Sequence, residues 1–162
     1  MVINYALRKQ PDIKAIVATS PFLRLAFQPP KWKVTLGKLM LKLAPSVTLP
    51  SAIEESAISS IPAEVKRYHE DPLIHGKISP MYLFPVIDAG EYAIANAYKL
   101  KIPILVTHGT GDRIIDYKGS VDFTNQAHGA ELKLYDNGYH ELHHDVCAEE
   151  MLLTIVKWLD KH

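Results

Sequence analysis

Short apolar runs near the two ends of the chain alternate with stretches of helical period. Three such runs predict strands, at residues 13–19, 102–107 and 131–135. The first two are almost continuously apolar, as expected for strands of a parallel sheet that are buried on both faces. Amphipathic patterns predict helices at residues 2–10, 117–128 and 145–161. This alternation of helices and strands is typical of an α/β fold with a parallel sheet.

The segment at residues 22–100 breaks this rhythm. Prolines recur along it and divide it into short pieces, for which we predict helices at residues 31–43, 63–69 and 81–100. The first piece is basic and amphipathic, and its apolar set consists of Trp32, Leu36, Leu39, Met40 and Leu43. Two interpretations remain open. The segment is either an irregular helical subdomain with an ordinary core or a cap over a site that receives an apolar ligand.

Composition and charge narrow the class of protein. Apolar residues make up 48% of the 162 residues and charged residues 22%, which is typical of an ordinary globular domain. Basic and acidic residues number 18 each, so the net charge gives no support for nucleic-acid binding. Cys147 is the one cysteine, which excludes an internal disulfide and is compatible with a reducing compartment.

The beginning of the chain carries no targeting pattern. Residues 1–9 lack the basic region and apolar run of a signal peptide, and no stretch approaches the roughly 20 apolar residues of a membrane span. We therefore expect a cytoplasmic protein with at most peripheral contact with lipid. The helix predicted at residues 2–10 has no N-cap residue before it, so we expect the chain to be part of a longer protein.

Two loops that follow predicted strands carry the candidate chemistry. Residues 108–116 contain Asp112, and residues 137–144 contain His140. Because parallel strands place their carboxyl ends at one edge of a sheet, the two side chains are expected to meet there. A carboxylate that orients an imidazole forms the acid and base of a hydrolase triad. The alternative is that Asp112 caps a turn and His140 is an ordinary surface residue.

These loops resemble a known family. Residues 104–112 resemble the strand and acid-bearing turn of α/β-hydrolases of the monoacylglycerol lipase and lysophospholipase branch, which is similar to the serine aminopeptidase S33 family. Residues 134–143 resemble the histidine loop of that branch, residues 15–21 resemble its strand before the cap, and residues 71–73 resemble an element inside the cap. The order and spacing of these matches cover nearly the whole chain.

The resemblance implies a fold and a domain organisation. The parent protein is expected to be a three-layer α/β-hydrolase sandwich with a helical cap inserted between strands, of which this chain is the C-terminal part. Residues 1–21 would supply a helix and strand of the core, residues 22–100 the cap, and residues 101–162 the rest of the core with the acid and histidine loops.

The resemblance also implies carboxylic-ester hydrolysis without a cofactor. Asp112 and His140 would be the triad acid and base, and the spacing favours Asp112 over Asp116, which is expected in the first turn of the next helix. The apolar helices of the cap suit a lipid-like ester such as a monoacylglycerol or lysophospholipid, with Trp32, Leu36 and Met40 as candidate substrate-binding residues.

The nucleophile of the family is missing from the sequence. The family places its serine in a G-x-S-x-G elbow. No serine of this chain has glycine at both flanking positions; the serines are Ser20, Ser46, Ser51, Ser56, Ser59, Ser60, Ser79 and Ser120. The resemblance puts the expected serine just upstream of Met1, so we expect the chain alone to be inactive. Ser20 and Cys147 are weak candidates for a nucleophile within the chain.

Two other classes of function remain open. One is a non-catalytic binding or interaction module that retains the cap but has no catalytic activity. The stretch His140-Glu141-Leu142-His143-His144 also matches H-E-x-x-H, the pattern of zinc hydrolases. That chemistry requires His140 and His144 on one face of a helix. A turn signal, Asn137-Gly138, lies directly before this stretch, so we expect no metal site.

Overall fold

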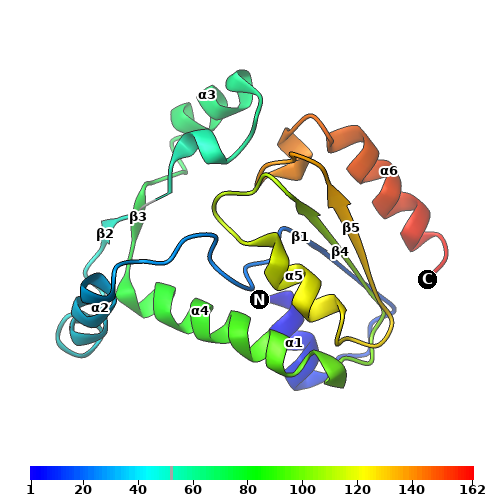
Figure 1. Ribbon diagram of the computed structural model, residues 1–162, viewed down its shortest axis with the longest axis horizontal. Coiled ribbons are helices and arrows are strands. Elements are labelled where there is room, and N and C mark those ends of the chain that lie inside the picture. The colour runs from blue at the N-terminus through cyan, green and yellow to red at the C-terminus, as the bar shows by residue number, and fades with distance from the viewer. Residues whose placement is uncertain (52) are drawn as a thin grey trace.

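The computed structural model describes residues 1–51 and 53–162 and places a three-stranded parallel sheet at its centre (Figure 1). The strands are β1 (Ile16–Thr19), β4 (Ile104–Gly109) and β5 (Ala130–Tyr135), and β4 lies between the other two. Ile16 pairs with Ile104, which pairs with Ala130, so the strands run in register and end at the same edge. The three predicted strands and their parallel arrangement are confirmed.

Helices cover both faces of this sheet (Figure 1). On one face lie α1 (Val2–Lys9), α4 (Pro80–Ala95) and α5 (Tyr117–Thr124), and on the other lies α6 (Ala148–Leu159). The main core lies under the first group and is formed by Ile3, Ala6, Leu7, Ile16, Ala18, Leu23, Ala93, Ile94, Ala97, Leu100, Ile102, Ile104, Val106, Phe123 and Ala127. The expected three-layer α/β arrangement is therefore confirmed.

The central strand is buried along its whole length, and this fixes the position of the loop after it. All six residues of β4 are buried. Alternate residues point to opposite faces, so Ile104, Val106 and His108 share the face that α5 covers. The loop that follows β4 therefore starts from a fixed position at the carboxyl edge of the sheet.

Residues 31–78, which lie within the expected cap and are called the cap segment below, lie beyond the carboxyl ends of the strands (Figure 1). It contains α2 (Lys31–Leu43), the short antiparallel pair β2 (Leu49–Pro50) and β3 (Lys77–Ile78), the 3₁₀ turn η1 (Glu55–Ala57) and α3 (Pro62–Glu70). Residue 52 of the expected cap lies outside the described residues. No helix in the described ranges is both long and apolar enough to span a bilayer.

Helix α4 joins the cap segment to the core. Its 16 residues make it about 24 Å long, so it contacts α2 at one part of its length and α1 and α5 at another. Ala93 and Ile94 of α4, with Ala97 and Leu100 after it, belong to the main core. The end of α4 and the residues after it, which lie within the expected 22–100 cap, thus pack against the core. The sequence pattern does not reveal this division because α4 is apolar on most of its sides.

Candidate active site

The loops after β4 and β5 are bound to each other by their backbones. The N–H of Thr110 donates to the carbonyl of Tyr135 at 2.9 Å, and the N–H of Gly111 donates to the carbonyl of Gly138 at 3.0 Å. A Cβ atom on Gly109 would overlap the carbonyl of Gly138, so only glycine permits this close approach. The acid-bearing loop and the histidine loop therefore form one unit at the carboxyl edge of the sheet.

Asp112 and His140 are in direct contact. Nδ1 of His140 lies 2.7 Å from Oδ2 of Asp112. The Asp112 side chain is fully buried, whereas 26% of the His140 side chain is exposed. The other oxygen of Asp112, Oδ1, accepts the backbone N–H groups of Ile114 at 2.8 Å and Ile115 at 2.9 Å. The contact expected from the positions of the two loops is present, with the imidazole on the accessible side.

A second histidine, to which the sequence analysis assigns no role, also binds this carboxylate. His108, at the end of β4, places Nε2 at 3.2 Å from Oδ2 of Asp112, and its Nδ1 lies 2.7 Å from the hydroxyl of Ser120 on α5. Both His108 and Ser120 are fully buried. A carboxylate only accepts hydrogen bonds, so His108 donates from Nε2, and a neutral His108 accepts the Ser120 hydroxyl proton at Nδ1.

These contacts keep the acid ionised. Burial alone raises the pKa of the Asp112 carboxyl, but the hydrogen bonds from His108 and His140 and the N–H of Ile115 outweigh it. The net effect holds the pKa of Asp112 well below its usual range. An ionised Asp112 fixes the proton of His140 on Nδ1. The Nε2 atom of His140 makes no hydrogen bond within the described ranges, so this atom is free to accept a proton.

The histidine loop is held from two other elements. The hydroxyl of Ser20, at the end of β1, donates to the backbone carbonyl of His140 at 2.7 Å. The N–H of Glu141 donates to the carbonyl of Ile58 in the cap segment at 2.9 Å. Ser20 has a left-handed backbone, with φ of 40°. Because its hydroxyl binds a backbone carbonyl and not the imidazole, Ser20 lacks the geometry of a nucleophile activated by His140.

A buried carboxylate fastens the same loop to the cap segment. Asp145 accepts the N–H of Ser60 at 2.9 Å and the N–H of Tyr139 at 2.6 Å, and the hydroxyl of Ser60 also donates to it. Burial raises the pKa of the Asp145 carboxyl, and the hydrogen bonds from Ser60 and Tyr139 lower it further than burial raises it. Asp145 is therefore ionised and structural, a role that no sequence pattern indicates.

The weaker candidates lie in structural positions. Asp116 caps α5, where its carboxylate accepts the N–H of Lys118 at 3.0 Å. Cys147 precedes α6 and is half-buried, and burial, reinforced by Asp145, raises the pKa of its thiol. A thiol with a raised pKa is protonated at neutral pH and is a poor nucleophile.

The pattern H-E-x-x-H has no zinc-hydrolase geometry. Residues Leu142–His144 form a single 3₁₀ turn, η3, so His140 and His144 do not share the face of an α-helix. His140 is bound to Asp112, whereas the Nδ1 atom of His144 lies 2.9 Å from the carboxylate of Glu141. The residues that do gather here are Glu141, His143 and His144.

The candidate substrate residues of α2 form an open apolar surface. Trp32 is 64% exposed and Leu36 is 48% exposed, while Met40 is half-buried. Leu39 and Leu43 are also exposed. A separate cavity of about 350 Å³ lies between the start of α1 and the end of β1, and it is lined by residues 1–4 and 17–23, which include Ser20.

Known proteins are similar to this chain in sequence. The family model of serine aminopeptidases, S33, matches residues 1–146. An uncharacterised abhydrolase domain-containing protein of Dictyostelium discoideum is 31% identical over 98% of this chain and 17% of its own length. The monoacylglycerol lipase of Mycolicibacterium smegmatis is 27% identical over 100% of this chain and 59% of its own length.

A solved structure is similar to this chain in both fold and sequence. The monoacylglycerol lipase of Paleococcus ferrophilus superposes with a TM-score of 0.91 at 33% identity, over 98% of this chain and 63% of that one. The chain thus spans about 60% of the length of these two lipases and a smaller share of the Dictyostelium protein. With the family model matching most of its residues, the chain belongs to the serine aminopeptidase S33 family of α/β-hydrolases, and it is similar to the monoacylglycerol lipases among them.

Proposed function

We propose that this chain carries the acid and the base of a serine carboxylic-ester hydrolase of the monoacylglycerol lipase type. The observation on which the proposal rests is the 2.7 Å contact between Nδ1 of His140 and Oδ2 of Asp112. A buried, ionised acid that orients a partly exposed imidazole is the arrangement that general-base catalysis requires.

The chemistry follows from this geometry. Nε2 of His140 takes the proton of a serine hydroxyl as the serine oxygen attacks the ester carbonyl. The resulting imidazolium is stabilised by the ionised Asp112 and returns the proton to the leaving alcohol, which leaves an acyl-enzyme. Water, deprotonated by the same imidazole, then releases the acid. No G-x-S-x-G sequence occurs in the 162 residues, so we propose that the serine and the oxyanion donors come from outside them.

The substrate is proposed to be a lipid-like ester. Two of the similar proteins are monoacylglycerol lipases, and the exposed apolar side chains of α2 suit an acyl chain or a lipid surface. Trp32, Leu36 and Met40 are the proposed contacts. Hydrolysis of this kind needs no cofactor, and we place the protein in the cytoplasm with peripheral lipid contact through the cap segment.

The first test measures the chain alone. We expect the purified 162-residue chain to hydrolyse a monoacylglycerol or a short p-nitrophenyl ester no faster than its own His140→Ala variant, because a base without a nucleophile forms no acyl-enzyme. Robust turnover that His140→Ala abolishes would mean that a nucleophile exists within these residues, and it would refute the split of the triad.

The second test adds the segment of a relative that this chain does not cover. The segment of the Paleococcus ferrophilus lipase that this chain does not cover is joined to the chain, since the two backbones superpose with a TM-score of 0.91. We expect the chimera to hydrolyse monoacylglycerol and to lose at least about a thousandfold in kcat on His140→Ala or Asp112→Ala. Asp116→Ala is the matched control in the same loop and is expected to retain activity within a few fold. A folded chimera in which His140→Ala leaves kcat unchanged would refute the assignment.

A non-catalytic binding module is the second candidate, favoured by the absence of a G-x-S-x-G sequence. In that case the chain would bind a monoacylglycerol through the cap segment, and the affinity would be unaffected by Asp112→Ala. A folded chimera that stays inactive while the chain retains such binding would support this alternative.

A further inference from the structure

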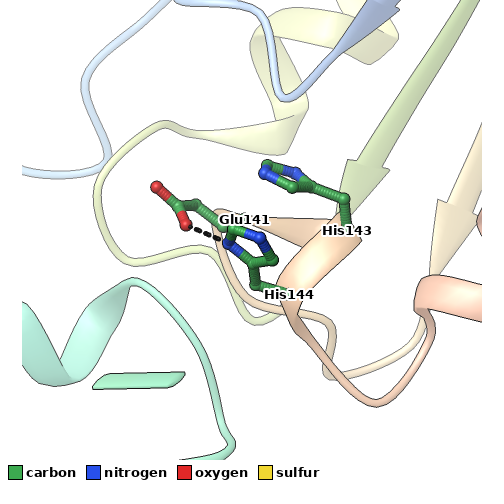
Figure 2. A group of neighbouring side chains, drawn as sticks. All are labelled: Glu141, His143 and His144. Atoms are coloured by element: carbon green, nitrogen blue, oxygen red, sulfur yellow. Dashed lines mark hydrogen bonds and ion pairs between the residues drawn. The ribbon is translucent and has the colours of Figure 1, made fainter. Parts of the chain in front are cut away.

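Three side chains that follow His140 converge on one point of the surface (Figure 2). One nitrogen of His143, one nitrogen of His144 and one carboxylate oxygen of Glu141 all lie within 4.8 Å of one another. Nδ1 of His144 is 2.9 Å from Oε2 of Glu141, and the two imidazole rings are 4.1 Å apart between centroids. None of these side chains takes part in the contact between Asp112 and His140.

Hydrogen bonds hold both ends of the turn that carries them. The N–H of Glu141 donates to the carbonyl of Ile58 at 2.9 Å, and the hydroxyl of Ser59 donates to the carbonyl of His144 at 2.6 Å. Within the turn, the N–H of His144 donates to the carbonyl of Glu141 at 2.8 Å. These hydrogen bonds place the backbone of η3, and with it the Cα positions from which the three side chains reach one another.

We propose that Glu141, His143 and His144 form a binding site for a divalent transition-metal ion of the zinc class. Zinc binds imidazole nitrogen and carboxylate oxygen at about 2.0–2.2 Å, so tetrahedral ligands lie about 3.3 Å apart. The His144–Glu141 pair is already near this separation, and the side chains are exposed enough for small rotations to close the rest. Two imidazoles and one carboxylate select this class over calcium and magnesium, which prefer oxygen ligands.

This site differs from the one that H-E-x-x-H would make. His140 is not a ligand, because its Nδ1 is bound to Asp112. The proposed ligands are Glu141, which precedes the 3₁₀ turn, and the adjacent residues His143 and His144 within it, and three protein ligands leave a fourth position for water. The ion would therefore leave the proposed base bound to Asp112.

The test is calorimetric titration of the purified chain with zinc chloride, with magnesium and calcium chloride as probes of selectivity. We expect one zinc ion per chain and no heat of binding from magnesium or calcium. His143→Ala and His144→Ala are each expected to weaken zinc binding at least tenfold, and Glu141→Gln by a smaller factor. The matched control is His128→Ala, which removes an exposed histidine elsewhere on the surface and is expected to leave the affinity within twofold.

A second measurement guards against effects on folding. In spectra of histidine ring nitrogens of the unmodified chain, we expect stoichiometric zinc to shift the resonances of His143 and His144. The hydrogen-bonded Nδ1 proton of His140 is expected to remain. Absence of zinc binding to the unmodified chain, or equal binding by a His143→Ala, His144→Ala double variant, would overturn the proposal. Loss of the His140 proton on adding zinc would also overturn it, because it would make His140 a ligand.

Discussion

Asp112→Asn replaces one oxygen of the central carboxylate by an amide group of the same shape. In the native protein four donors converge on the two carboxylate oxygens: the rings of His108 and His140 on Oδ2, and the N–H groups of Ile114 and Ile115 on Oδ1. The asparagine carbonyl can still accept the two backbone groups. Its amide group, however, faces two imidazole nitrogens that donate, so both rings must change tautomer.

The cost can be worked from these four bonds. Hydrogen bonds to a charged group contribute about 1.5–3 kcal/mol and neutral ones about 0.5–1.5 kcal/mol, so loss of the charge weakens each bond by about 1 kcal/mol. We expect Asp112→Asn to lower the free energy of unfolding by about 2–4 kcal/mol. Asp112→Ala is expected to cost about 3–5 kcal/mol, because it leaves His108, Ile114 and Ile115 with buried, unsatisfied donors.

The assay is urea-induced unfolding at pH 7, followed by circular dichroism, together with the ring nitrogen resonances of His140. The spectra should show that the proton of His140 moves from Nδ1 to Nε2 in Asp112→Asn. Asp116→Asn is the control, since Asp116 caps α5 and makes no contact with the imidazole, and it should leave the His140 tautomer unchanged. Equal stability of Asp112→Asn and the native chain, with an unchanged His140 tautomer, would refute the reasoning.

Three further predictions concern pH, packing and the thiol. The pKa values of Asp112 and Asp145 are depressed in the folded state, so the folded protein binds fewer protons than the unfolded chain. The free energy of unfolding should therefore fall as the pH drops through about 4 and below. Acid titration followed by circular dichroism measures this loss, and its absence would contradict the reasoning. Gly109→Ala should destabilise the chain by about 3 kcal/mol or more, because its Cβ overlaps the Gly138 carbonyl, as urea unfolding can measure. Burial raises the pKa of Cys147, so Ellman's reagent should react with it far more slowly at pH 7.5 than with the urea-unfolded chain, and equal rates would contradict this.

The sequence predicts the parts of the fold whose signal is local. Buried, β-rich runs mark β1 and β4, and the order of strand, loop, helix and strand places Asp112 and His140 at one edge. Parallel pairing of neighbouring strands then makes their contact a geometric consequence.

The remaining features depend on tertiary packing. To predict the hydrogen bond that the Ser120 hydroxyl donates to His108, one must know which face of β4 points to α5, and a histidine inside an apolar strand carries no signal of that kind. Asp145 looks like any acid near a helix start, and its partner Ser60 is 85 residues away. The sequence does not show that α4 contacts both the cap segment and the core, because the helix is continuous and apolar along its length.

The Asp145 carboxylate ties the cap segment to the histidine loop. It accepts the N–H groups of Ser60 in the cap segment and Tyr139 in the histidine loop, so one carboxylate binds both segments. Moving residues 59–60 away from the histidine loop would therefore break a hydrogen bond to a charged group, at a cost of about 1.5–3 kcal/mol.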